Sequence, residues 1–174
     1  MNKTSKQVLS VNEYDHRQGS IDAPYVLVEY GDYQCPYCGE ADAVVKEIQS
    51  RLGDKLCFVY RNFPLVEIHS HAEHAAEAAE AAGIQGRFWE MHDLLFENQD
   101  ALDDENLAEY AEALNLDARR LITDVRKGAH AARIQKDLQS GEQVGVNGTP
   151  TFFVNGELFE AEPTAEELIA ALTE

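Results

Sequence analysis

Residues 25–52 read YVLVEYGDYQCPYCGEADAVVKEIQSRL, and this stretch decides the fold. Its first six residues are β-branched, aromatic or apolar, with the exception of Glu29. Such a run predicts a strand that is covered on both faces of a sheet. From Pro36 to Leu52 apolar residues recur at helical spacing, and proline suits the first position of a helix. The stretch therefore predicts a central strand that leads directly into a helix.

The following segments extend this pair of elements. Residues 55–63, KLCFVYRNF, predict a second strand, which Pro64 ends. Strand, helix and strand at this spacing imply a right-handed crossover between two parallel strands. From His69 to Val144 the chain is rich in helix formers with helical apolar spacing, which predicts an insertion of several helices.

The end of the chain returns to β structure. Two short apolar runs flank Asn155 and Gly156, and Asn-Gly is the strongest short signal for a β-hairpin. Thr164 and Glu167 then form a capping-box pattern, which predicts a final helix. The order is β-α-β, helical insertion, β-hairpin and helix, in an α/β protein.

We therefore divide the chain into four segments and expect them to form one structural unit, because no low-complexity linker separates them. Residues 1–18 are an N-terminal extension, in which QVLSV at 7–11 suits a short strand. The other segments are the βαβ half at 19–68, the helical insertion at 69–145 and the ββα half at 146–174.

Composition and charge narrow the class of protein. The chain has 174 residues, 44% of them hydrophobic and 26% charged, as in ordinary globular domains. A net charge of −18 would repel phosphate backbones, which argues against nucleic-acid binding. No apolar run approaches membrane-spanning length, and the first twenty residues lack the apolar core of a secretory signal. We expect a cytoplasmic protein that does not bind membranes.

Two of the three cysteines form a C-x-x-C motif at the predicted helix start. Cys35 would occupy the N-cap, where free backbone N–H groups and the helix dipole stabilise a thiolate. Such settings lower a cysteine pKa to about 3.5–7.5. Cys38 lies one helical turn further, on the same side and more buried. This asymmetry predicts that Cys35 attacks a disulfide and that Cys38 resolves the mixed disulfide.

Two other interpretations of the motif are weaker. A structural disulfide between Cys35 and Cys38 would close a loop of only two intervening residues, and it would therefore constrain little of the chain. A zinc site would need two more ligands, and no second cysteine pair or spaced histidine pair completes one, so we expect no metal. Cys57, in the middle of a predicted strand, is most simply a small buried hydrophobe.

Several stretches together resemble the thioredoxin fold, and in particular the short DsbA-like thiol:disulfide oxidoreductases. They are YGDYQCPYCG, NFPL, HSHAEHAAEAAEAAG, FWEMHDLLFENQ and VNGTPTFFVNG, in the family's order across about residues 19–173. The resemblance implies a thioredoxin fold with a helical insertion between its halves. It also implies an enzyme that exchanges dithiols and disulfides with protein substrates. Its only cofactor would be the redox-active Cys35–Cys38 disulfide, with glutathione as a candidate redox partner.

The resemblance also assigns site residues. Cys35 and Cys38 match the redox pair. Pro150 matches a cis-proline that faces the pair, and the Thr149 backbone would pair with an extended substrate segment. Glu29 matches a buried acid that relays a proton to and from Cys38, a role that a pKa raised by burial suits. The alternative for Glu29 is an edge-strand position pointing to water.

Two departures from the family concern the motif. Its middle residues are Pro36 and Tyr37, as in glutaredoxins, where the strongest oxidants of the family carry a histidine. The acidic side chains of Asp32, Glu40 and Asp42 flank the pair, and like charge opposes thiolate formation. Both features predict a milder redox couple, and the direction of electron flow stays open.

Other histidines and aromatic residues are interpreted from the family's architecture. We expect His69, His71 and His74 to cap and pack a helix start rather than to bind metal. Trp89 and Met91 are expected to border an apolar groove beside Cys35.

Three alternative functions remain open on sequence alone. One is a glutathione-dependent isomerase or transferase on the same fold. Another is a non-catalytic redox-sensing or chaperone module, and the third is a metal-binding module. The sequence determines neither the recycling partner nor the oligomeric state.

Overall fold

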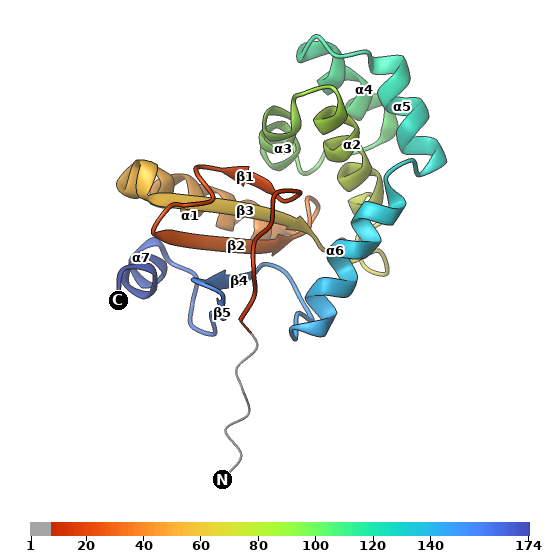
Figure 1. The fold of residues 1–174 in the computed structure, drawn as a ribbon. Coiled ribbons are helices and arrows are strands. Elements are labelled where there is room, and N and C mark those ends of the chain that lie inside the picture. Colours follow the sequence, from red (N-terminus) through yellow and green to blue (C-terminus); the bar gives the residue numbers. More distant parts are fainter. Residues whose placement is uncertain (1–7) are drawn as a thin grey trace.

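The structure is a computed structural model that describes residues 8–174. Its centre is a five-stranded sheet in the order β1-β3-β2-β4-β5 (Figure 1). Strands β2 and β3 are parallel, and the other neighbours are antiparallel. The predicted central, doubly covered strand is β2, as expected. The strands are β1 His16–Gln18, β2 Tyr25–Gly31, β3 Leu56–Asn62, β4 Thr151–Val154 and β5 Glu157–Leu158.

Helices cover this sheet and form a second lobe (Figure 1). Helices α1 and α7 pack against each other and against the sheet, and α2 to α5 gather in the lobe. Helix α6 runs from the lobe back past the sheet, where it contacts β3, and the chain then continues into β4. The predicted α/β fold with a helical insertion between two halves is confirmed. The helices are α1 Pro36–Leu52, η1 Gly53–Lys55, α2 Ala72–Ile84, α3 Phe88–Glu97, α4 Asp104–Ala113, α5 Ala118–Lys127, α6 Ala131–Gln143 and α7 Ala165–Thr173.

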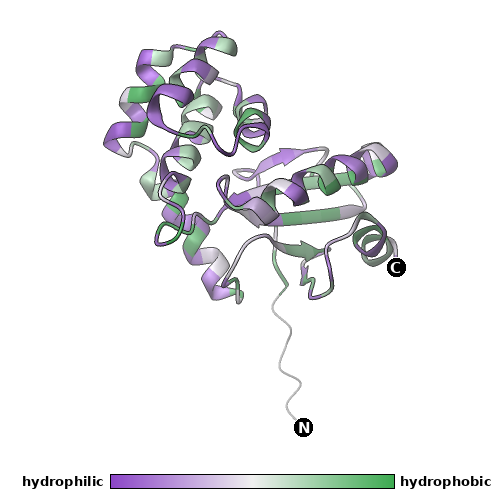
Figure 2. Cartoon of the chain, turned by 180° about the vertical axis from the view of Figure 1, so that it is seen from behind, coloured by the Kyte–Doolittle hydropathy of each residue, from purple (hydrophilic) through white to green (hydrophobic). Residues whose placement is uncertain are grey.

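Side-chain alternation along β2 separates two apolar clusters, one on each face of the sheet. Leu27 belongs to the larger cluster, which also holds Cys35, Cys38 and the buried face of α1. Val28 and Tyr30 belong to the smaller cluster on the opposite face. Figure 2 shows α1 lying over the sheet, with polar and apolar residues alternating along the helix. Glu29 shares the face of Leu27, since side chains two apart in a strand point the same way.

Local signals place the hairpin and the last helix as predicted. Asn155 and Gly156 have φ values of 50° and 87°, both in the left-handed region that this tight turn requires. The Asn155 side chain accepts from the Val26 N–H at 3.0 Å and donates to the Leu172 carbonyl at 3.0 Å. It thereby ties the turn to both β2 and α7. Thr164 caps α7 by accepting from the Glu167 N–H.

The N-terminal extension differs from the prediction. Of the QVLSV stretch, Gln7 lies outside the described residues, and residues 8–11 form no strand. Leu9 and Val11 instead pack on the smaller apolar cluster. The strand of this region is β1, whose polar sequence HRQ carries no strand periodicity. Its pairing with β3 is supported by a long-range contact of His16 with Glu80 at 2.9 Å, which no local pattern encodes.

None of the helices that residues 8–174 form has the combined length and apolar character needed to cross a membrane.

Replacing Leu168 with alanine should destabilise the protein by about 2–5 kcal/mol, because its fully buried side chain would leave a cavity beneath α7. The matched control is Leu158→Ala, at an exposed position of β5, with a loss below about 1 kcal/mol. Urea unfolding of the reduced protein measures both. Equal losses would contradict the packing of α7 described above.

Candidate active site

The site is built where β2 ends and α1 begins. Cys35 is the N-cap of α1 with extended backbone angles, and Pro36 occupies the first helical turn, as predicted. The Cys35 carbonyl accepts from the N–H groups of Cys38 at 3.1 Å and Gly39 at 3.2 Å. Both cysteines are free thiols. Cys35 keeps 4% of its surface exposed and Cys38 none, so Cys35 is the more accessible sulfur.

The two thiols have opposite pKa shifts. Hydrogen bonding from the Cys38 thiol lowers the pKa of Cys35 to about 5, against the effect of burial. The backbone N–H groups of Cys38 and Tyr37 add to this lowering. Burial raises the pKa of Cys38 well above its ordinary value, and Cys35 and the charge of Glu29 raise it further. At neutral pH the pair therefore holds one thiolate and one proton.

Nearby acids do not prevent this thiolate. The sequence suggested that Asp32, Glu40 and Asp42 would oppose it, yet the donors around Cys35 outweigh them. Asp32 faces the neighbouring loop, where its carboxylate accepts from the Gln34 and Leu65 N–H groups at 2.7 and 2.9 Å. The acids therefore do not prevent a thiolate at Cys35. The milder redox couple of Cys35 and Cys38 stays a prediction.

The loop before β4 lies opposite Cys35. The Cys35 thiol is 3.6 Å from the Thr149 carbonyl oxygen, and the Thr149–Pro150 peptide bond is cis. The antiparallel pairing of β4 with β2, in which Thr151 opposes Tyr30, brings this distant segment to the motif. The structure thus places Thr149 and Pro150 beside the redox pair, and their contact with substrate stays a prediction.

Glu29 is buried on the central strand, with 1% of its surface exposed, so the edge-strand alternative is wrong. Burial raises the pKa of its carboxyl well above the ordinary range, and the charges of Asp42 and Cys35 raise it further. Within residues 8–174, neither Glu29 Oε1 nor the Tyr60 hydroxyl has a hydrogen-bond partner. The site thus keeps a buried carboxyl group on the same side of the sheet as the two sulfurs.

Gly31 leaves the space that Glu29 and Tyr60 occupy. A Cβ atom at this position would lie 2.6 Å from Tyr60 Cε2 and 3.0 Å from Glu29 Oε1. Real Cβ atoms do not approach other atoms at the first of these distances, and the Tyr60 ring is buried. Glycine is therefore required here for packing.

The helical lobe contacts the region of the motif through three hydrogen bonds that the sequence did not predict. The Gln99 side-chain amide donates to the carbonyl oxygens of Tyr33 at 3.0 Å and Cys35 at 2.8 Å. The Tyr33 hydroxyl lies 2.9 Å from His92 Nδ1, and burial lowers the pKa of that histidine. Only the tertiary approach of the lobe brings these residues to the motif, and no local pattern marks them.

Metal-ligating groups are occupied by other partners. Among residues 8–174, the cluster of His, Cys, Asp and Glu side chains that is tight enough for an ion is Asp42, His92 and Asp93. The Lys46 ammonium lies 2.6 Å from Asp42 and 3.3 Å from Asp93, so a protein cation already serves these carboxylates. Cys57 is buried in the apolar cluster on the other face of the sheet, as predicted for a small hydrophobe.

The three histidines at the start of the insertion do not cap it. His71 is the N-cap of α2 but makes no side-chain cap. His69 lies 2.7 Å from Asp32, and His74 lies 2.6 Å from Asp104. The prediction of capping was therefore wrong, because aspartates distant in sequence provide partners for two of them.

The groove beside the motif is also lined differently from the expectation. Met91 is fully buried, and Trp89 packs on Phe58 and donates to the Arg17 carbonyl. Neither lines the cavity next to the pair, which instead lies between α1 and the segment before α7. The expectation was wrong because α3 packs its aromatic face into the protein core.

The fold and the cysteine pair at the start of α1 are those of a thioredoxin-fold protein with a C-x-x-C motif. A family model described as thioredoxin matches residues 11–174, so the chain belongs to the thioredoxin family, within its DsbA-like members. The predicted thioredoxin fold and the resemblance to DsbA-like proteins are confirmed.

Solved structures of similar fold include oxidised BdbD from Bacillus subtilis, with a TM-score of 0.80 and 26% identity. The match covers 91% of this chain and 90% of the BdbD chain. A thioredoxin-like oxidoreductase from Silicibacter pomeroyi DSS-3 has a TM-score of 0.81 and 27% identity. That match covers 92% of this chain and 91% of the Silicibacter chain. Wolbachia pipientis alpha-DsbA1 shares the fold, with a TM-score of 0.79 and 18% identity. That match covers 94% of this chain and 92% of the Wolbachia chain.

Curated relatives with higher identity are much longer proteins. The Na(+)/H(+) antiporter NhaA 1 of Salinispora arenicola is 45% identical over 159 residues, which are 91% of this chain and 24% of the antiporter. The Na(+)/H(+) antiporter NhaA 1 of Mycobacterium sp. (strain KMS) is 44% identical over 162 residues, 92% of this chain and 26% of that protein. The chain thus spans about a quarter of the length of these relatives.

The thiolate of Cys35 should form with a midpoint near pH 5, so its alkylation by iodoacetamide should rise through that pH and level off above it. Cys38→Ala should move the midpoint to higher pH, because it removes the thiol that hydrogen-bonds to Cys35. Cys38→Ser keeps a donor and is the control. Mass spectrometry of Cys35 gives the rates, and a wild-type midpoint near 8.5, that of an unperturbed cysteine, would refute the assignment.

Gly31→Ala should destabilise the reduced protein by about 1–3 kcal/mol, because its Cβ overpacks the buried Tyr60 ring. Gly148→Ala is the control, since a Cβ there meets nothing within 4 Å, and its effect should stay within about 0.5 kcal/mol. Urea unfolding compares the two variants. A Gly31→Ala protein as stable as the control would show that Tyr60 and Glu29 move apart freely.

Proposed function

We propose that this protein exchanges dithiols and disulfides with protein substrates through Cys35 and Cys38. The observation that carries the proposal is the split of the pair into a low-pKa, more accessible Cys35 and a high-pKa, fully buried Cys38. A nucleophilic thiolate and a resolving thiol need these two environments. Thr149 and Pro150 beside the sulfur support a binding position for an extended substrate segment.

The exchange proceeds in two displacements. The Cys35 thiolate attacks one sulfur of a substrate disulfide, and the other substrate sulfur leaves as a thiolate. Cys38 then loses its proton and attacks the Cys35 sulfur, which releases the second substrate thiolate. Two electrons pass from the pair to the substrate, and the reverse sequence donates a disulfide.

Glu29 is the proposed acceptor of the Cys38 proton. It lies in the same buried region, and its raised pKa keeps a proton on the carboxyl more readily than an exposed glutamate would. The electrostatic effect of Glu29 on Cys38 supports a direct coupling between the two groups. A cytoplasmic location is also proposed.

A second candidate function is a thiol-exchange module that serves a Na(+)/H(+) antiporter. It is favoured by the relatives of that name, in which the segment similar to 91–92% of this chain forms 24–26% of the antiporter. The substrate would then be a cysteine pair on the antiporter.

Cys35→Ser should abolish reduction of insulin disulfides, because the attacking sulfur is lost. Cys38→Ala should instead accumulate mixed disulfides, because nothing resolves them. Non-reducing gels and mass spectrometry of cells that express Cys38→Ala identify the trapped proteins. Cys57→Ala is the matched control and should keep wild-type turnover. Undiminished turnover by Cys35→Ser would overturn the mechanism, and absence of an antiporter among the trapped proteins would reject the second candidate.

A further inference from the structure

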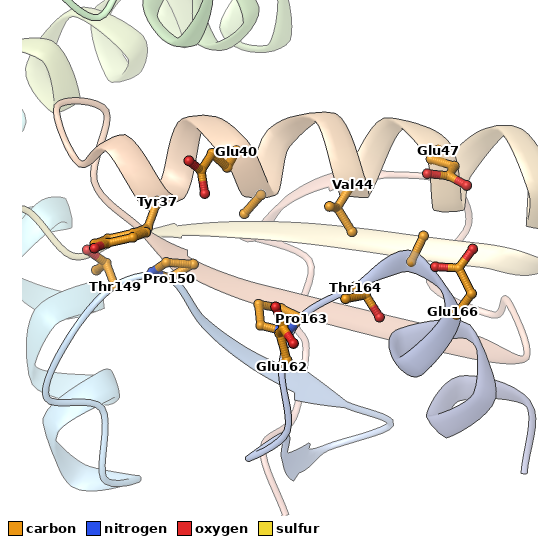
Figure 3. A pocket seen from close by; sticks show the side chains of 12 residues that line it. Tyr37, Glu40, Val44, Glu47, Thr149, Pro150, Glu162, Pro163, Thr164 and Glu166 are labelled. Carbon is orange, nitrogen blue, oxygen red and sulfur yellow. The ribbon is translucent and has the colours of Figure 1, made fainter.

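A groove extends away from the redox pair between α1 and the segment that precedes α7 (Figure 3). Its volume is about 660 Å³. Tyr37, Thr149 and Pro150 form the end next to Cys35, and Figure 3 shows that the groove continues along α1 past Val44. Its apolar lining consists of Ala41, Val44, Pro150, Pro163 and Ala165.

The charged side chains along this groove are all acidic. They are Glu40 and Glu47 from α1 together with Glu162 and Glu166 from the opposite wall (Figure 3). At the far end, Arg51 Nη1 lies 3.5 Å from Glu47 and 3.4 Å from Glu166, so these two carboxylates share a cation.

Glu40 and Glu162 differ from that neutralised pair. Both are exposed, and among residues 8–174 neither side chain has a cationic or hydrogen-bonding partner. They lie on opposite walls, Glu40 close to Tyr37 and Glu162 beside Pro163 (Figure 3). The part of the groove nearer the redox pair therefore combines an apolar floor with two uncompensated negative charges.

We propose, resting on the proposed function, that this groove selects substrate segments that carry lysine or arginine close to the reactive cysteine. The aliphatic stem of such a side chain would cover the apolar floor, and its charged head would reach Glu40 and Glu162. Pairing of the segment with the Thr149 backbone would hold the reactive cysteine of the substrate at the end of the groove next to Cys35. The occupant is thus a cationic segment of a partner protein.

The same charges act against glutathione. This tripeptide has two carboxylates and one ammonium group, so its net charge at neutral pH is negative. In the groove its carboxylates would face Glu40 and Glu162 without a neighbouring cation, and like charge there raises the free energy of binding. The groove therefore discriminates against a glutathione-dependent reaction and in favour of basic protein segments.

The test uses three disulfide-bridged peptides that differ only in the residues flanking the cysteines, which are lysine, glutamine or glutamate. Reduced full-length protein is mixed with each peptide at physiological ionic strength, and quenched samples give the rate constant of peptide reduction. We expect the lysine peptide to react about tenfold faster than the glutamate peptide, about threefold for each carboxylate. The glutamine peptide normalises for changes in the nucleophilicity of Cys35.

Two double variants of equal net charge separate the groove from the general field of the protein. In Glu40→Gln/Glu162→Gln the preference should fall to about twofold or less, and reduction of oxidised glutathione should become faster. Glu109 and Glu112 lie at exposed positions of α4. In Glu109→Gln/Glu112→Gln the lysine preference and the rate of glutathione reduction should both stay at the wild-type level.

The outcomes are distinguishable. A lysine preference that survives in Glu40→Gln/Glu162→Gln, or that falls equally in both double variants, would overturn the groove as its source. Equal rates for all three peptides with wild-type protein would also overturn it while leaving the proposed function intact. If wild-type protein reduces no peptide although Cys35 is alkylated normally, the proposed function itself fails.

Discussion

The contact between two sulfurs at the start of α1 is the interaction on which the rest of the site depends. A thiolate at Cys35 is stable because the buried Cys38 thiol and backbone N–H groups donate to it. Cys38 keeps its proton because burial excludes the water that would stabilise its charge. Two cysteines that are three apart in the chain therefore have different surroundings and different reactivity.

Much of the surrounding protein holds this contact in place. Gln99 from the helical lobe donates to the Cys35 carbonyl, while Asp32 accepts from the loop that follows β3. The segment at Thr149 closes the third side. Each of these contacts involves a backbone group in or beside the motif, which keeps the helix start ordered without covering Cys35 completely. The helical insertion thus contributes to the site as well as to the core.

Sequence reasoning succeeded where a local pattern has one physical solution. Pro36 begins α1, Asn155 and Gly156 turn the hairpin, and Thr164 caps α7, because each residue type suits only a few backbone conformations. It failed where the partner is distant. The strand β1 has no periodicity of its own, and His69 and His74 pair with aspartates from other elements. The donors that lower the Cys35 pKa despite the neighbouring acids include Cys38, whose burial is complete only after folding.

The sequence by itself determined the fold class, the order of the elements and the position of both cysteines at a helix start. These follow from periodicity and capping, which act over a few residues. Only the tertiary structure decided that Glu29 is buried, that Cys35 and Cys38 differ so strongly in pKa, and that Glu40 and Glu162 face one groove. Burial and electrostatic coupling depend on which segments meet in space, and that information is spread over the whole chain.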